Sequence, residues 1–152
     1  MYLKIGQKVP EFSLPNYNNN MVSLSDFTDS KILIWFFPKA NTPGWTIQGC
    51  GFRDEFKKFE DKGVVILGVS ADSPLKQYNF VQKYNFPYLM LSDESKNMLK
   101  DYKVWGLKKF MGREYEGIHR ISYLIDEKRV IQCVFDKVKT KTHAQDVLNE
   151  IS

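Results

Sequence analysis

The residue types best suited to chemistry lie in residues 36–54, where three local patterns meet. A run typical of a buried strand ends, a loop with two prolines and a glycine follows, and a helical pattern then begins. In open α/β sheets, ligand sites lie beyond the carboxyl ends of the strands, which is where this loop falls. Free backbone N–H groups at the start of the helix favour an anion or a thiolate. This segment is therefore the predicted functional site.

The sequence contains two cysteines, Cys50 and Cys133, too few for a disulfide framework. This usage favours a reducing compartment, and we expect a cytoplasmic protein. There is no Cys-x-x-Cys motif, so a thioredoxin or disulfide isomerase role is unsupported. Cys133 lies in a largely apolar run, and we expect it in the core because free cysteine is commonly buried.

The only histidines are His119 and His143, and neither has a second ligand type at metal spacing. We therefore predict no metal site, and no feature of the sequence calls for a cofactor. His119 is expected to be a strand residue beside Arg120, and His143 an exposed first residue of the last helix. Asp93 and Glu94 are expected in a turn, as charges at the start of a helix.

The composition is that of a globular protein, with 43% hydrophobic and 26% charged residues in a chain of 152. We expect one domain over residues 1–152. No segment approaches the ~20 apolar residues of a membrane span, and the first residues lack the apolar core of a signal peptide. The net charge is +4, and lysines such as Lys108 and Lys109 are not interleaved with aromatic residues. Neither membrane nor nucleic-acid binding is therefore predicted.

Apolar patterns along the chain alternate between buried strands and amphipathic helices. Phe52, Phe56 and Phe59 form one apolar stripe at helical spacing. Ser73 is expected to cap another helix, with Pro74 in its first turn. The expected strands are residues 31–37, 64–70 and 87–91, and the expected helices are residues 45–62, 74–84 and 96–102.

Two hairpins are predicted from turn signals. Residues 18–20 are all asparagine, which tolerates left-handed backbone and bonds its own main chain, so they predict a turn between residues 11–14 and 21–24. Residues 118–126 and 129–135 predict a second antiparallel pair near the end of the chain. The first hairpin is an addition to the α/β core.

The last helix is expected to start at Thr142, where Thr142 and Gln145 match a capping box. Residues 105–113 are expected to form a loop over the mouth of the site. Strand, helix, strand, helix, hairpin and helix in this order predict an α/β protein of thioredoxin-like fold. Its central mixed sheet is flanked by helices, with right-handed crossovers between the parallel strands.

Pro38 and Thr42 precede position 45 in a spacing that resembles the Pro-x-x-x-Thr-x-x-Cys signature of peroxiredoxins. Longer matches follow in order over nearly the whole chain. They narrow the resemblance to the bacterioferritin comigratory protein subgroup, also called the Q-type peroxiredoxins. The matching segments are residues 12–15, 68–74, 91–94, 104–106, 117–122 and 124–126.

The resemblance implies a thioredoxin-dependent reductase of H2O2 and organic hydroperoxides. In this family a peroxidatic cysteine thiolate at the helix start attacks the O–O bond and becomes a sulfenic acid. In many Q-type members, a resolving cysteine five residues later condenses with it, and thioredoxin reduces the disulfide. A helix N-terminus and a nearby arginine both lower the pKa of such a thiol.

The same resemblance implies residue roles and partners. Arg120 is the arginine beside the thiolate, Thr42 hydrogen-bonds thiolate and peroxide, and Cys50 is the resolving cysteine. The implied partners are a hydroperoxide and thioredoxin or a similar dithiol, and the implied state is a monomer. The rest of the substrate-binding loop is Pro38, Pro43 and Gly44.

Trp45 stands where the family has its nucleophile. Indole does not ionise and has only an N–H donor, so it cannot attack a peroxide as a thiolate does. Cys50 lies about 140° around the helix and ~7.5 Å along it, away from the free amides, so it is at best a slow thiol. We therefore expect the chain to be inactive or nearly so.

Three accounts of Trp45 stay open. It is a single engineered or accidental change in a working peroxiredoxin, the mark of a natural non-catalytic paralogue, or a UGA codon that inserts selenocysteine or another residue. We favour the first account, because Thr42 and Arg120 are both in place. The alternative function is a non-catalytic binding domain that uses the helix-start amides, Thr42 and Arg120 as an anion site.

Overall fold

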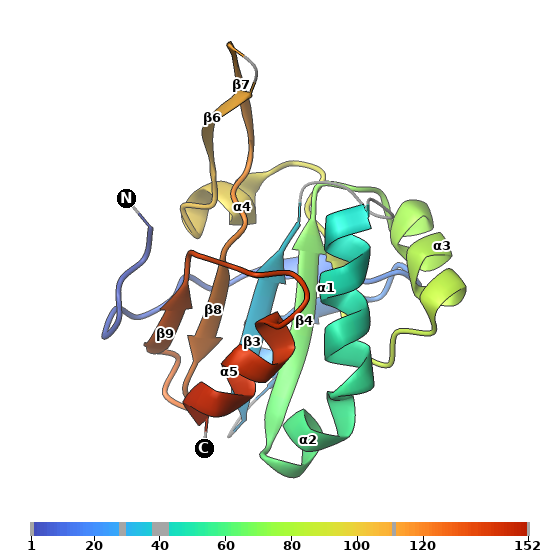
Figure 1. Cartoon of the computed structure of the whole chain (residues 1–152), viewed down its shortest axis with the longest axis vertical. Helices are drawn as coiled ribbons and strands as arrows, with labels where there is room; N and C mark the ends of the chain where they lie inside the picture. Colours follow the sequence, from blue (N-terminus) through green and yellow to red (C-terminus); the bar gives the residue numbers. More distant parts are fainter. Residues whose placement is uncertain (1, 28–29, 38–42, 111, 152) are drawn as a thin grey trace.

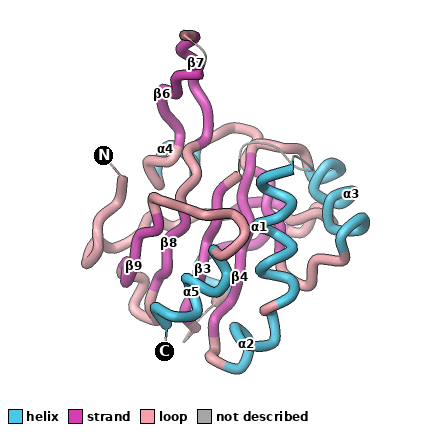
Figure 2. Tube along the Cα trace, in the orientation of Figure 1, coloured by secondary structure: helices cyan, strands magenta, loops and turns pink. Residues whose placement is uncertain are grey.

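The computed structural model describes residues 2–27, 30–37, 43–110 and 112–151, and for residues 43–45 and 110 it describes the backbone alone (Figure 1). A central sheet lies between helices, and a long hairpin projects from one end of the molecule. The strands of this sheet and of the hairpin are distinguished from the helices in Figure 2.

The central sheet has five strands in the order β5-β4-β3-β8-β9. β3 (Lys31–Phe36), β4 (Val64–Ser70) and β5 (Leu89–Ser92) are parallel to one another. β8 (Ser122–Ile125) is antiparallel to β3, and β9 (Ile131–Phe135) is antiparallel to β8. The predicted mixed sheet is therefore confirmed, and so is the predicted late hairpin, although its first strand begins at Ser122 instead of Ile118. His119, expected to lie on a strand, is outside it.

β3 is covered on both faces, which explains its nearly continuous apolar sequence. Side chains alternate between the faces of a strand. Ile34 and Phe36 belong to the hydrophobic cluster on one face, and Leu33 and Trp35 belong to the cluster on the other. All four side chains are fully buried.

Helices cover the two faces unequally. One face carries α1 (Pro43–Asp54), α2 (Phe56–Asp61), α3 (Pro74–Tyr84) and α5 (His143–Ile151), whose apolar residues share a cluster with alternate residues of β3. The other face is covered by α4 (Asn97–Asp101) and by apolar side chains of the N-terminal segment. In α3 the Ser73 side chain accepts a bond from the Lys76 amide, as its capping pattern predicts.

The N-terminal hairpin is present as predicted. β1 (Ser13–Pro15) pairs with β2 (Met21–Ser23), and Asn19 in the turn has a left-handed φ of 62°. A short 3-10 helix, η1 (Leu24–Asp26), follows directly. Buried Leu14 and Leu24 attach this segment to the cluster on the α4 side of the sheet.

The single helix expected over residues 45–62 is wrong. The chain forms α1 and α2, which are separated at Glu55, where ψ is 7° and the helical geometry is interrupted. Phe52 and Phe59 are both buried on the two sides of this break, and their ring centroids lie 5.8 Å apart. Phe56, the third member of the expected stripe, is only partly buried.

The loop expected over residues 105–113 is also wrong. β6 (Trp105–Phe110) and β7 (Arg113–Ile118) form an antiparallel hairpin that projects away from the central sheet (Figure 1). Gly112 has a φ of 78° near its tip, a conformation that glycine adopts without steric cost.

His143 is buried, although an exposed position was expected. Its Nε2 lies 2.8 Å from Ser122 Oγ, and the rings of Phe52 and Phe135 lie edge-on to it. The helix therefore begins with a buried polar contact. Among the described contacts, Thr142 and Gln145 do not form the expected capping box, and the Thr142 hydroxyl donates to the Asp146 carboxylate.

The burial of His143 predicts a loss of stability in mild acid. Burial lowers its pKa from 6.5 to about 4, so between these values the unfolded chain binds a proton that the folded chain does not. The contribution of neutral His143 to the free energy of unfolding is complete above pH 6.5. It falls as the pH approaches about 4, by up to about 3 kcal/mol. Urea unfolding across this range should show the fall, and His143→Gln should flatten it. Equal pH dependence in the two proteins would contradict this assignment.

Replacing either of two glycines of α1 by alanine should have opposite effects on the stability of the fold. A Cβ on Gly49 would lie 2.9 Å from Phe86 Cζ and 3.2 Å from Trp35 Cη2, whereas on Gly51 the contact nearest to it is Ala144 Cβ at 3.7 Å. We expect Gly49→Ala to destabilise the fold by about 1–3 kcal/mol through overpacking. Gly51→Ala should be neutral or stabilising by up to about 1 kcal/mol, because alanine favours helix. Thermal unfolding of both variants checks this, and similar effects at the two positions would contradict it.

Candidate functional site

The start of α1 faces the carboxyl end of β3, where the sequence predicted the site. α1 begins at Pro43, so position 45 lies in its first turn, among backbone amides that have no partner within the helix. The helix has twelve residues, long enough for its dipole to favour negative charge at this end. Pro38 and Thr42 lie outside the described residues, and only the backbone is described for Pro43, Gly44 and Trp45.

α1 is held closely against the sheet. Tyr88, buried in the segment leading into β5, donates its hydroxyl to the Gly49 carbonyl at 2.7 Å. Burial raises the pKa of Tyr88 well above its usual value, so the side chain stays a neutral donor. Arg53 Nη1 donates to the Tyr84 carbonyl at 2.8 Å, a second link between α1 and the end of α3. These contacts fix the orientation of the helix that carries the site.

Gln48 and Thr46 are unusual within α1. Gln48 is 1% exposed, and neither polar atom of its side chain has a hydrogen-bond partner among the described residues. The Thr46 hydroxyl is likewise buried without a partner there. Buried polar groups are normally satisfied, so these side chains mark the first turns of α1 as a polar environment. Sequence reasoning did not single them out, because a helical Gln or Thr is ordinarily a surface residue.

Cys50 lies on α1, five residues beyond position 45, and is half-buried. Burial raises the pKa of its thiol, and the nearby charge of Arg53 only partly offsets this. The thiol is therefore mostly protonated at neutral pH, as its distance from the helix start predicts. Cys133 is half-buried against the same hydrophobic cluster instead of fully buried, and burial also raises its pKa.

Arg120 lies beside the end of β3 because of strand pairing. The Phe36 amide donates to the Ile121 carbonyl at 3.1 Å, and Trp35 pairs with Ser122. Arg120 directly precedes these residues, so it stands at the end of β3 from which the chain proceeds to α1. Arg120 is exposed, and partial desolvation lowers the pKa of its guanidinium, which nonetheless stays charged at neutral pH.

Two further basic residues accompany Arg120. Lys108, from β6, is half-buried, and its pKa is lowered by burial and by the charge of Arg120. His119 is also half-buried and packs edge-on against Tyr2, with the ring centroids 5.9 Å apart. Burial and the charge of Lys108 lower the pKa of His119. In the sequence, Lys108 was indistinguishable from other solvated lysines. The Asp93 carboxylate, expected in a turn, is buried and accepts a bond from the Leu99 amide in α4.

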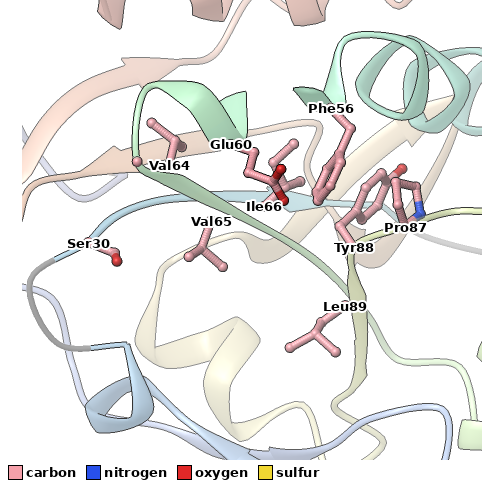
Figure 3. Close-up of a pocket in the computed structure, with 10 residues that line it drawn as sticks. Ser30, Phe56, Glu60, Val64, Val65, Ile66, Pro87, Tyr88 and Leu89 are labelled. Carbon is pink, nitrogen blue, oxygen red and sulfur yellow. The ribbon is translucent and has the colours of Figure 1, made fainter. Parts of the chain in front are cut away.

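A cavity of about 330 Å³ lies at the other end of the sheet, by the amino ends of β4 and β5 (Figure 3). Its lining is mainly apolar, with the carboxylate of Glu60 near the rings of Phe56 and Tyr88. Neither Cys50 nor Arg120, the predicted site residues whose side chains are described, lines it. This cavity is therefore separate from the candidate site.

The described part of the chain contains no group of three or more His, Cys, Asp or Glu residues that could hold a metal ion. Within the same residues, no helix combines the length and the apolar character that crossing a membrane requires.

Residues 5–134 match the family model described as the AhpC/TSA family. The chain is 46% identical to the peroxiredoxin Bcp of Escherichia coli strain K12 over 147 residues, which cover 97% of this chain and 94% of that protein. It is 39% identical to the peroxiredoxin Bcp of Bacillus subtilis strain 168, and the match covers 99% of this chain and 96% of that protein.

Solved structures agree with the sequence relatives. A cysteine-to-serine mutant of PrxQ from Xylella fastidiosa has a TM-score of 0.93 and 29% identity, covering 99% of this chain and 96% of that one. The peroxidoxin BcpB of Mycobacterium tuberculosis has a TM-score of 0.88 and 28% identity, and the match covers 99% of this chain and 97% of that one. From its sequence and its thioredoxin-like fold, the chain therefore belongs to the AhpC/TSA family and, within it, to the bacterioferritin comigratory protein (PrxQ) subgroup of peroxiredoxins.

Proposed function

We propose that this chain is the scaffold of a thioredoxin-dependent hydroperoxide reductase whose nucleophile position is occupied by Trp45. The observation that carries the proposal is the placement of position 45 in the first turn of α1, at the end of the sheet where Arg120 lies. Family membership supports the reaction, and the relatives are themselves named peroxiredoxins.

In the proposed reaction a thiolate at position 45 attacks the distal oxygen of a hydroperoxide. The O–O bond breaks, the thiolate becomes a sulfenic acid, and the leaving alkoxide or hydroxide takes up a proton. Arg120 stabilises the thiolate and the developing charge, and Thr42 orients the peroxide through its hydroxyl, with Pro38, Pro43 and Gly44 shaping the loop. The Cys50 thiol then displaces water from the sulfenic acid to form a disulfide, which an external dithiol reduces.

The resolving step requires movement of α1. Residues five apart in a helix have Cα atoms about 8–9 Å apart, whereas a disulfide needs about 4.4–6.8 Å. The first turns of α1 must therefore unwind before a bond from position 45 to Cys50 can form. The half-burial and raised pKa of Cys50 fit a thiol that reacts only after such unwinding.

With Trp45 in place, the first step has no nucleophile. Indole has no ionisable group in the physiological range and no lone pair available for attack on a peroxide. Cys50 lies away from the helix-start amides and its thiol has a raised pKa, so it does not replace the missing thiolate. We therefore propose that the chain as written is inactive or nearly so.

Restoring the thiol should restore the reaction. We expect Trp45→Cys to raise kcat/KM for H2O2 and for an organic hydroperoxide by at least about 1000-fold, the scale on which losing a nucleophile acts. Thioredoxin-coupled peroxide consumption measures this. Trp45→Ser is the matched control, because it removes the indole without supplying a thiolate, and it should stay inactive.

Each other outcome of this experiment identifies a specific error. If neither Trp45→Cys nor the original chain turns over, the site is more than one residue from activity and the peroxidase proposal fails. If the original chain turns over, Cys50 acts as a nucleophile, and Cys50→Ser should abolish that activity.

A second candidate function is an anion-binding domain without catalysis. It is favoured by the buried Gln48 and Thr46 side chains, which have no partner among the described residues and lie in the first turns of α1. Together with Thr42, Arg120 and the helix-start amides they would form the site.

Calorimetric titration with small anions tests this second function. The original chain should then give binding heat at millimolar sulfate or phosphate, and Arg120→Met should remove most of it, because a charge-assisted contact is lost. Absence of detectable heat at millimolar concentration would exclude the binding domain.

The setting of the protein is part of the proposal. We propose a cytoplasmic monomer of one domain over residues 1–152, which acts on hydroperoxides with thioredoxin or a similar dithiol as reductant. Nucleic acid and membranes are not proposed as partners. The two free cysteines among the described residues, both half-buried, support a reducing compartment.

A further inference from the structure

The second half of α1, from Gly49 onward, is held firmly by other elements. Gly49 lies so close to Phe86 that a Cβ on it would be 2.9 Å from the ring. Phe52 is fully buried, and its ring lies 5.4 Å from that of His143 in α5. Arg53 donates to the carbonyl at the end of α3 at 2.8 Å. Three successive contacts therefore fix this half of the helix in place.

The first half of α1 has the opposite features. The Thr46 hydroxyl and both polar atoms of the Gln48 side chain are buried without a hydrogen-bond partner among the described residues. Ile47, between them, is apolar yet 42% exposed. Unpaired polar groups in the interior cost free energy, and water would satisfy them if these turns unwound. The first half is therefore the part of α1 that opens most readily.

The carbonyl of Gly49 marks the division between the two halves. It accepts the hydroxyl of buried Tyr88 at 2.7 Å. In an α-helix the same carbonyl also accepts from the amide four residues later, which is that of Arg53. If the residues before Gly49 unwind, the bond to Arg53 becomes the first bond of the remaining helix. Tyr88 therefore holds the carbonyl at which that remaining helix begins.

This division falls directly before Cys50. Unwinding of residues 43–48 frees position 45 to approach Cys50, while Cys50 stays on the half that Tyr88 holds. Adding turns to an existing helix forms one hydrogen bond per residue, whereas a new helix requires a costly nucleus. A second half that stays folded therefore lets the first turns form again without a new nucleus.

We propose that Tyr88 is a positioning residue: its hydroxyl, bound to the Gly49 carbonyl, stops the unwinding of α1 at Gly49 and keeps Cys50 on a folded helix while position 45 moves. The inference rests on the proposed function for the reason that α1 must open. The division of α1 at Gly49 is a property of the chain with Trp45 and is measured there.

The first measurement is amide hydrogen exchange in the original chain, followed for each residue by NMR. Unwinding of residues 43–48 breaks the bonds from the amides of residues 47–52 to carbonyls four residues earlier. It leaves the bonds of residues 53–55 intact, including the bond from the Glu55 amide to the Gly51 carbonyl. We expect residues 47–52 to exchange at least about tenfold faster than residues 53–55, which should exchange as slowly as the amides of β3.

Tyr88→Phe removes the hydroxyl and keeps the ring. We expect the amides of residues 53–55 to exchange about tenfold faster relative to those of β3, the scale of one lost hydrogen bond. Tyr102→Phe is the matched control, because that buried tyrosine donates its hydroxyl to the Pro10 carbonyl at 2.6 Å in the other hydrophobic cluster. It should leave the exchange of residues 53–55 relative to β3 unchanged.

A second measurement uses the disulfide form, in a chain that combines Trp45→Cys with Cys133→Ser. Diamide takes two electrons and two protons from the thiols at positions 45 and 50, so the disulfide forms and the reagent becomes a hydrazine. Residues 53–55 should stay protected from exchange in this form, and adding Tyr88→Phe should make them exchange about tenfold faster.

The outcomes separate this inference from the proposed function. The role of Tyr88 is overturned if residues 47–52 and 53–55 exchange equally fast in the original chain, or if Tyr88→Phe and Tyr102→Phe act equally on residues 53–55. Neither measurement requires reduction of a peroxide. Peroxide turnover by Trp45→Cys decides the proposed function independently.

Discussion

The structure depends on β3 being buried on both of its faces. The strand is hydrogen-bonded to β4 on one side and to β8 on the other, and its side chains enter both hydrophobic clusters. A strand enclosed in this way cannot shift its register without exposing apolar side chains. Its carboxyl end is therefore a fixed point, and both the start of α1 and Arg120 are placed relative to it.

The pairing of β3 with β8 has a direct chemical consequence. Residues 36 and 121 are far apart in the sequence, yet a backbone hydrogen bond of 3.1 Å joins them. The bond brings Arg120 to the end of β3 while Gly49, lacking a side chain, lets α1 approach the rings of the sheet. The helix dipole and the guanidinium therefore act at one end of the molecule. In the proposed function, this arrangement suits a thiolate and gives indole no chemical role.

Basic side chains lie near one another at the same end of the molecule. Glycines at the base of the hairpin allow Lys108 and His119 to pack against the backbone, and the strand register sends the nearby glutamates to the other face. In the proposed function, Arg120 is the member of this group that acts at position 45.

The sequence by itself determined most of the strands and helices, the α/β class and, through its resemblance, the family, and it predicted the segment that we propose as the site. These follow from local signals: apolar periodicity, the asparagine turn, the Ser73 cap and the spacing of Pro38, Thr42 and position 45. Only the tertiary structure decided the break at Glu55, the burial of His143 and the anchoring of Lys108. Each depends on contacts between segments distant in the sequence, and a lysine or a histidine carries no local sign of the partner that will bury it.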